Sequence, residues 1–185
     1  MNYLQDYIPI CENFEGSEPS MYLDTKGNVT VGVGFMIPTP LAACGYPFYL
    51  LGGTTLATAQ EITTAWNRVK AMPPGMQAEK YAYPGCLILL QNDIYAHLLA
   101  ELTTLDEALA KGITNYANLP DSVKMALLDQ GWNLGLNGLL HGYPKEIACV
   151  EAGDFAGAAV QCHRNGIQES RNEWCALQFT SAITA

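Results

Sequence analysis

Three polar residues near the start of the chain, Glu15, Asp24 and Thr30, have the types and the spacing for acid–base chemistry on a glycosidic bond. Such a cleavage needs one carboxyl group that stays protonated, so that it can donate to the leaving oxygen, and a second polar group that handles water or the oxocarbenium charge. Glu15 and Asp24 are candidates for these two roles. Each could instead be an ordinary carboxylate at a helix end or turn, and Thr30 an ordinary strand residue.

A helix followed by a β-hairpin is expected to position these residues. An apolar stripe at helical spacing, interrupted by Pro9, predicts a helix over 2–13 that leads to Glu15. After it, Lys26–Gly27 supplies a bend and valines alternate with threonine and glycine over 29–34. Because side chains alternate along a strand, Thr30 is expected on the face opposite the valines, where it can share a space with Asp24.

The pattern over 15–34, Glu-Gly, then Tyr-x-Asp, then Gly-x-x-Thr-x-Gly-x-Gly, closely resembles the lysozymes of tailed phages, glycoside hydrolase family 24. This resemblance implies that Glu15 is the general acid and that Asp24 and Thr30 position the attacking water. It also implies an α+β, lysozyme-like fold, mostly helical, with a small β-hairpin lobe and a larger helical lobe. We expect one catalytic domain over 1–185: a small lobe at about 14–85, a long connecting helix at about 86–110, and a helical lobe at about 111–185 plus the N-terminal helix.

Two later motifs add substrate-binding candidates. Trp132-Asn133-Leu134-Gly135 resembles the end of the family's central helix, where the amide faces the cleft, so Asn133 is a candidate substrate contact. Alternatively, its amide donates a hydrogen bond to a free carbonyl group at the C-terminus of the helix. The run 162–174 resembles the last part of the family, which implies that Arg171, followed by Asn172, reaches the catalytic Glu and the substrate. Otherwise Arg171 is a surface residue that pairs with a glutamate at helical spacing, at position 169 or 173.

The remaining elements are expected to be mainly helices. A capping box at Thr58–Glu61 predicts a helix to Met72, and Leu119–Pro120 opens a central helix that ends at Gly135. Further helices are predicted over 86–109, 143–152, 155–164 and 169–179. The segments 36–53 and 76–85 are expected to be loops. Aromatic residues in the first of these loops could stack on sugar rings, although a role as apolar cover for the small lobe is favoured.

Some residues depart from the family or lack a role in it. Phe35 stands where the family often has a polar residue, commonly His, so the polar pairing of that residue must be absent or replaced. His97 is expected to be a surface or capping histidine. The six cysteines show no CxxC pair and no Cys/His cluster at zinc spacing, so no metal site is predicted. Mostly free, buried thiols are favoured, although an even number could pair in a periplasm.

The composition of the chain limits the kinds of partner that it can bind. The chain has 18 Asp and Glu against nine Lys and Arg, a formal net charge of −9, which argues against nucleic acid or an anionic membrane as a partner. No apolar stretch reaches the roughly 18 residues of a membrane span, and no phosphate loop or dinucleotide fingerprint predicts a cofactor.

The resemblance implies a monomeric muramidase that hydrolyses the β-1,4 bond between N-acetylmuramic acid and N-acetylglucosamine in peptidoglycan glycan strands. Inversion is expected, because a hydroxyl such as that of Thr30 can hold a water but has no use in direct carboxylate attack. One alternative is a lytic transglycosylase, which needs Glu15 but neither Asp24 nor Thr30. The other is a catalytically inactive cell-wall-binding protein, which would have no reason to keep all three.

The place of action follows from the expected substrate. No signal-peptide pattern opens the sequence, so we expect a protein made in the cytoplasm that acts on the cell wall in the periplasm. It would arrive there through a phage holin or a contact-dependent secretion machine, and the acidic balance favours the second. A cognate inhibitor or immunity protein is a further candidate partner.

Overall fold

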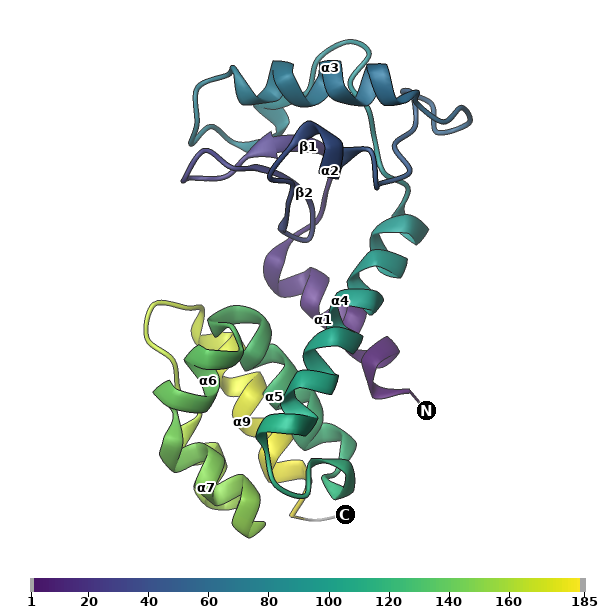
Figure 1. Cartoon of the computed structure of the whole chain (residues 1–185). Coiled ribbons are helices and arrows are strands. Elements are labelled where there is room, and N and C mark those ends of the chain that lie inside the picture. The colour runs from purple at the N-terminus through teal and green to yellow at the C-terminus, as the bar shows by residue number, and fades with distance from the viewer. Residues whose placement is uncertain (1, 184–185) are drawn as a thin grey trace. The chain divides into compact units, whose positions relative to one another are not determined.

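The computed structural model describes residues 2–183 and has an α+β fold that is mostly helical with one small antiparallel sheet (Figure 1). The chain divides into two compact units. We call Cys11–Leu98 the hairpin unit, and the described residues of Met1–Ile10 and Leu99–Ala185 the helical unit. The division falls inside two helices, α1 (Tyr3–Glu15) and α4 (Gln91–Gly112), so each of them contributes residues to both units.

The sheet of the hairpin unit has the order β1-β2-β3. Its strands are β1 (Glu18–Leu23), β2 (Val29–Gly32) and β3 (Phe35–Met36). The predicted hairpin is confirmed, with Tyr22 opposite Thr30 and Leu23 opposite Val29. All four residues of β2 are buried, so the face that carries Thr30 is covered as well as the valine face.

A tight turn connects the first two strands. The Asp24 N–H donates to the Asn28 carbonyl at 3.0 Å, and Gly27 has a φ of +79°, a backbone conformation that glycine adopts without a Cβ penalty. These are local interactions among neighbouring residues. They explain why the sequence alone was enough to place the turn.

Helix α3 (Ala59–Lys70) packs on β1 and β2 (Figure 1). The predicted capping box is confirmed, because the Glu61 carboxylate accepts from the Thr58 N–H at 2.8 Å and the Thr58 hydroxyl accepts from the Glu61 N–H at 3.3 Å. The helix ends two residues before the predicted Met72. The expected loops also contain short helices, α2 (Pro40–Ala43), capped by Thr39, and the 3₁₀ helix η1 (Ala78–Tyr81).

The long helix α4 begins at Gln91, five residues later than predicted. The preceding segment is extended, because Ile88 forms antiparallel bridges with Ser20 and Tyr49. Leu87 and Leu89 are buried in this extended segment. A run of leucines is compatible with helix or strand, and here pairing with distant residues decided the outcome.

In the helical unit, the short 3₁₀ helix η2 (Tyr116–Asn118) precedes a buried central helix, α5 (Asp121–Leu134), against which α9 (Glu169–Ser181) packs. The other helices are α6 (Leu136–Gly142), α7 (Pro144–Ala152) and α8 (Phe155–Gln161). The predicted end of α5 at Gly135 is confirmed. So is the cap of α8, where the Asp154 carboxylate accepts from the Gly157 N–H at 2.8 Å. Helix α6 was not predicted, and α8 ends three residues earlier than expected.

The cysteines agree with the expectation of free thiols. All six are unpaired by disulfides, and those at positions 11, 86, 162 and 175 are buried. Within residues 2–183, every helix is too short or too polar to cross a membrane.

Candidate active site

Glu15 is the last residue of α1, and its side chain is exposed. Gly16, with a φ of +75°, turns the chain out of the helix toward β1. Glu12, one turn earlier, accepts from the Gln91 amide at 2.6 Å and from the Tyr95 hydroxyl at 2.5 Å. Burial opposes ionisation of Glu12, but these hydrogen bonds hold its pKa below the usual value. Glu12 is therefore held as an anion by these two donors, whereas the Glu15 side chain is exposed.

The Asp24 carboxylate is bound within its own turn. One oxygen, Oδ1, accepts from the N–H groups of Lys26 and Asn28 at 2.9 and 2.8 Å, and Oδ2 accepts from the Asn28 amide at 2.9 Å. Burial raises the pKa of Asp24, yet these hydrogen bonds and the Lys26 charge hold it below the usual value, so Asp24 is ionised at neutral pH. A carboxylate has about four acceptor positions. About one of them is therefore left for a further donor such as water.

Thr30 is buried, with 4% of its surface exposed, and its hydroxyl donates to the Asn28 carbonyl at 3.2 Å. This bond uses the only hydrogen of the hydroxyl and leaves its lone pairs to accept from other donors. Asn28 thus binds both Asp24, through its amide and its N–H, and Thr30, through its carbonyl. Sequence reasoning did not single out Asn28, because a turn residue beside glycine carries no chemical signal of its own.

Tyr22 relates the two candidate carboxylates to each other. Its pKa is raised, first by burial and then by the negative charges of Asp24, Glu18 and Glu15. All three charges therefore act on the same phenol, which lies on β1 directly opposite Thr30. Both Glu15 and Asp24 thus act on Tyr22, which stays neutral at ordinary pH because its pKa is raised.

The departure at Phe35 has a structural counterpart. The buried Phe35 ring meets the ring of His97 edge to face, with 4.4 Å between centroids. The Nε2 atom of His97 is also 3.1 Å from the Tyr46 hydroxyl. His97 is therefore a packed, half-buried residue, which corrects the expectation of a surface or capping histidine. An aromatic contact therefore occupies the position where the sequence analysis expected a polar pairing to be absent or replaced.

The aromatic residues of the 36–53 segment are partly used in packing. Phe48 is fully buried, and Tyr46 contacts both Phe48 and His97. These contacts agree with the favoured role of apolar cover.

The predicted substrate-binding residues of the helical unit lie around one buried anion, Asp129. Its Oδ1 atom accepts from the Tyr7 hydroxyl at 2.8 Å and from Arg171 Nε at 2.9 Å. Its Oδ2 atom accepts from Arg164 Nη2 at 2.5 Å. Asp129 has no exposed surface, and Arg164 and Arg171 are 1% and 5% exposed. Arg171 is thus a buried cation held by Asp129, rather than a surface residue paired with a nearby glutamate.

Asn133 and Asn172 both contact Arg164. The exposed Asn133 accepts from Arg164 Nη1 at 3.4 Å. Asn172 accepts from the Arg164 N–H and donates to the Arg164 carbonyl, each at 3.0 Å. All three predicted residues, Asn133, Arg171 and Asn172, therefore belong to one network centred on Asp129 and Arg164. Sequence reasoning did not single out Asp129 or Arg164, because their partners in this network lie up to 122 positions away along the chain.

A second buried carboxyl group, Glu146, lies near this network. It accepts from the Gln130 amide, and burial raises its pKa to about 7 against the opposing effects of that bond and the Arg164 charge. The other Glu146 oxygen and the Gln130 oxygen have no hydrogen-bond partner among the described residues. A single partner is little compensation for a buried charge, which agrees with a group that is easily protonated.

No group of three or more His, Cys, Asp or Glu side chains within residues 2–183 is arranged to hold a metal ion. The arrangement in the hairpin unit can perform acid–base chemistry: an exposed carboxyl at a helix end, an ionised carboxylate with room for one donor, and a hydroxyl that can accept. No protein-family model matches the chain, and no curated protein sequence matches it.

Proposed function

We propose that this chain is a peptidoglycan hydrolase with a lysozyme-like fold, a muramidase that cleaves the β-1,4 bond between N-acetylmuramic acid and N-acetylglucosamine. The observation that carries this proposal is the hairpin in which Asn28 binds both Asp24 and Thr30, directly after the helix that ends in Glu15. Burial and then the charges of both carboxylates raise the pKa of Tyr22. Three residue types at the family's intervals, on the expected helix end and hairpin, support one site.

In the proposed reaction, Glu15 donates a proton to the glycosidic oxygen as the bond to the anomeric carbon breaks. A water attacks that carbon from the opposite face, and Asp24 takes the proton of the water. Asp24 suits this role because its lowered pKa keeps it ionised. The Thr30 hydroxyl accepts a hydrogen bond from the same water, since its own hydrogen is donated to Asn28. Attack from the opposite face inverts the anomeric configuration.

The predicted substrate contacts in the helical unit, Asn133 and Arg171, stay predictions. Arg164 and Asp129 support them by fixing the positions of both side chains. Asn172 is predicted as a third contact, yet its amide already donates to and accepts from the Arg164 backbone. We therefore give Asn172 a supporting role in the proposal.

One observation favours a second candidate, a lytic transglycosylase. Both Asp24 oxygens are engaged in the turn, as expected of a residue that serves the hairpin rather than a water. A transglycosylase keeps Glu15 and needs no activated water, because the sugar closes on itself to an anhydro product. The two reactions differ in their products, so a product analysis decides between them.

The test is digestion of purified peptidoglycan by the intact chain, followed by turbidity and by proton magnetic resonance of the first products. We expect lysis and an α-anomer before mutarotation. A β-anomer would make Asp24 a nucleophile, an anhydro sugar would indicate a transglycosylase, and binding without cleavage would indicate a wall-binding protein.

The matched variants are Glu15→Gln and Glu79→Gln. General acid catalysis contributes roughly 10² to 10⁴ in rate, so Glu15→Gln should lose at least 99% of the activity. Glu79 is exposed on η1 and outside the proposed site, and its variant should keep full activity. If Glu15→Gln kept more than about a tenth of the activity, Glu15 would not be the acid.

The proposed substrate sets the proposed place of action, the cell wall in the periplasm. Delivery by a contact-dependent secretion machine is the route favoured by the net charge of −9, and a phage holin is the alternative. A cognate immunity protein would then be the expected partner in the producing cell.

A further inference from the structure

A groove of about 270 Å³ lies in the hairpin unit between α3 and the segment that follows Tyr83. This volume is just under the roughly 300–1,000 Å³ of common small-molecule sites. Its lining combines an apolar floor with polar side chains from one face of α3. The lining residues are Leu50, Gln60, Glu61, Thr64, Ala65, Arg68, Tyr83, Gly85 and Leu87.

Arg68 is the cation of this groove. Its guanidinium carbon lies 3.7 Å from the centroid of the Tyr83 ring, so the two planes are in contact. Among residues 2–183, no carboxylate lies within salt-bridge distance of Arg68. Stacking holds a guanidinium by its face and leaves its N–H edge to donate. That edge matches a carboxylate, which accepts two parallel hydrogen bonds.

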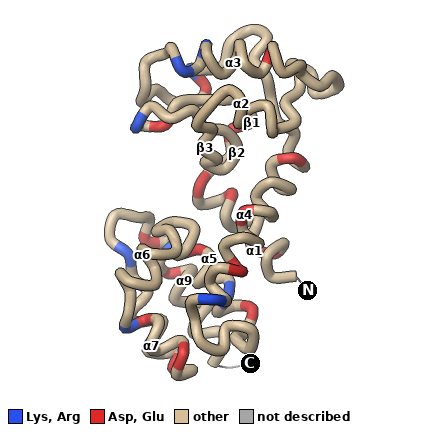
Figure 2. The backbone as a smooth tube through the Cα atoms, in the orientation of Figure 1, with Lys and Arg blue, Asp and Glu red and all other residues tan. Residues whose placement is uncertain are grey.

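The other cations of the hairpin unit lie outside the lining of this groove. The Lys and Arg residues of the hairpin unit are Lys26, Arg68, Lys70 and Lys80, and Figure 2 shows basic and acidic segments side by side near α3. Lys70 donates to the Gly27 carbonyl at 2.7 Å, which places it beside that turn. Acidic residues accompany these lysines, since Asp24 shares the turn with Lys26 and Glu79 precedes Lys80, so Arg68 is the one cation among the residues that line the groove.

The groove also contains one anion, Glu61. Its carboxylate is part of the capping box, and the hydrogen bonds from Thr58 lower its pKa, so it is ionised. Glu61 and Arg68 are seven residues apart on α3, a rise of about 10.5 Å. Three extended peptide residues span about the same length. A ligand with a carboxylate at one end and an ammonium group at the other therefore complements this face of α3.

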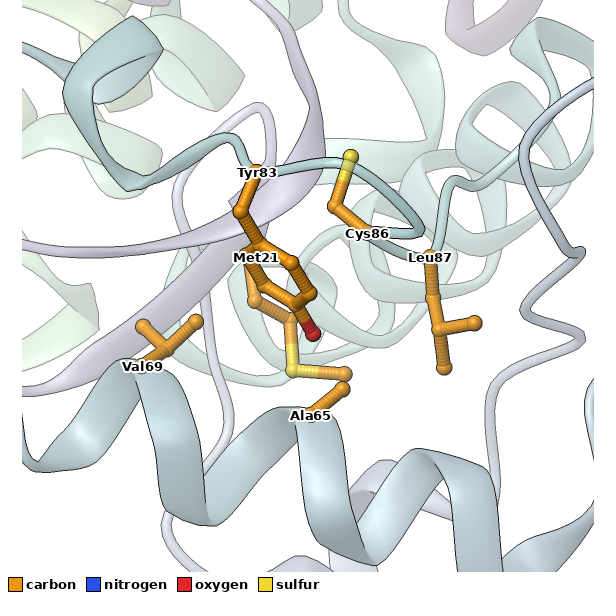
Figure 3. Close-up of a pocket in the computed structure, with 6 residues that line it drawn as sticks. All are labelled: Met21, Ala65, Val69, Tyr83, Cys86 and Leu87. Atoms are coloured by element: carbon orange, nitrogen blue, oxygen red, sulfur yellow. The ribbon is translucent and has the colours of Figure 1, made fainter.

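The floor of the groove is closed and apolar. Three of its lining residues, Ala65, Tyr83 and Leu87, also line a separate cavity of only about 10 Å³, together with Met21, Val69 and Cys86 (Figure 3). In Figure 3 the Tyr83 ring extends toward α3, between Val69 and Leu87. A cavity of this size holds at most about one water, so the ligand lies on the floor and does not enter it.

We propose that this groove binds the stem peptide of peptidoglycan, with Arg68 on a carboxylate and Glu61 on the ammonium group of the diamino acid. The choice of this peptide rests on the proposed function, since the same polymer carries the glycan bond and the peptide. The apolar stretch between the charges, Leu50, Ala65 and Leu87, contacts the aliphatic parts of the peptide. The groove would thus direct the chain to wall regions whose stem peptides have a free amino group.

The probe is N-acetyl-L-Ala-γ-D-Glu-L-Lys, titrated into the intact chain by calorimetry, with a second peptide whose lysine side chain is acetylated. We expect sub-millimolar binding of the first peptide. Arg68→Gln should weaken it at least about 10-fold, because the paired hydrogen bonds and the charge are lost together. Lys26→Gln makes the same change in net charge outside the groove and should leave the affinity within about twofold.

Glu61→Gln tests the other end of the peptide, because glutamine at this position keeps the capping box. It should weaken binding of the lysine peptide several-fold and leave the acetylated peptide unchanged. Absence of binding by the wild type at millimolar peptide, or an equal loss in Lys26→Gln and Arg68→Gln, would overturn the proposal. Thermal melts of each variant show whether a loss of binding is a loss of fold.

Digestion of peptidoglycan, measured in parallel, separates this proposal from the proposed function. A chain that digests the wall but does not bind the peptide refutes the groove alone. A chain that binds the peptide but does not digest the wall supports the groove and refutes the hydrolase.

Discussion

Replacing Asp129 with asparagine should destabilise the helical unit strongly. Asparagine keeps the shape of the side chain but removes the negative charge that faces Arg164 and Arg171, both almost fully buried. Its amide would also bring N–H donors toward guanidinium N–H donors. Breaking a buried ion pair from one side costs about 3–5 kcal/mol, because the remaining charge is left uncompensated. We expect a loss of this size in the free energy of unfolding.

The expected loss converts into a large shift of the urea midpoint. With a denaturant slope of about 2 kcal/mol per molar urea, 3–5 kcal/mol corresponds to about 1.5–2.5 M. Trp132 and Trp174 lie in the helical unit, so their fluorescence follows its unfolding in a shared Trp66→Phe background. Urea titrations at pH 7 then give the midpoint of each variant.

Glu107→Gln is the matched control, because Glu107 is an exposed acid on the part of α4 that belongs to the helical unit. A surface change of this kind should stay within about 0.5 kcal/mol. If Asp129→Asn cost less than about 1 kcal/mol, or no more than the control, the two arginines would have to be compensated elsewhere. The account of Asp129 as the centre of the network would then be wrong.

Three further changes test other parts of the structure. Thr30→Ala should lower peptidoglycan hydrolysis at least about 10-fold while serine at this position restores part of the rate, and equal rates for alanine and serine would remove the hydroxyl from the mechanism. Gly32→Ala should lower the melting temperature more than Gly34→Ala. Both glycines have a positive φ, but only at position 32 would the new Cβ meet the Phe35 ring, at 2.8 Å. Equal shifts in melting temperature would show that this contact has no effect. Burial raises the pKa of Glu146 from 4.5 to about 7, so the free energy of unfolding should fall by roughly 3 kcal/mol as the pH rises through that range. Urea titrations at pH 5, 6, 7 and 8 measure this dependence, and Glu146→Gln should remove it. An unchanged pH dependence in the variant would assign the effect to another group.

The elements that the sequence predicted well depend on interactions between near neighbours. The β1–β2 turn is set by Gly27 and by the Asp24 side chain, which bonds residues two and four positions ahead. The start of α3 is set by the capping box of Thr58 and Glu61, three residues apart. Local signals of this kind act before distant parts of the chain meet, so a single sequence shows them.

Where the sequence prediction was incomplete, contacts with residues far away in the sequence decided the local structure. The segment 86–90 has the leucine spacing of a helix, yet bridges from Ile88 to Ser20 and Tyr49 hold it extended. The first helix was predicted to end at residue 13, yet α1 continues to Glu15, and Glu12 in its last turn accepts hydrogen bonds from Gln91 and Tyr95. Tertiary contacts outweighed local propensity at both places.

The candidate site shows the same difference. The sequence by itself determined the elements that carry Glu15, Asp24 and Thr30, because a helix end and a short hairpin are set by residues within 15 positions of one another. The anion that holds Arg171 was decided only by the tertiary structure. Asp129 and Arg171 lie 42 positions apart, and a buried charge is compensated by whichever opposite charge the packed helices bring to it. That pairing has no periodicity and no fixed spacing, so it becomes visible only when α5 and α9 are packed together.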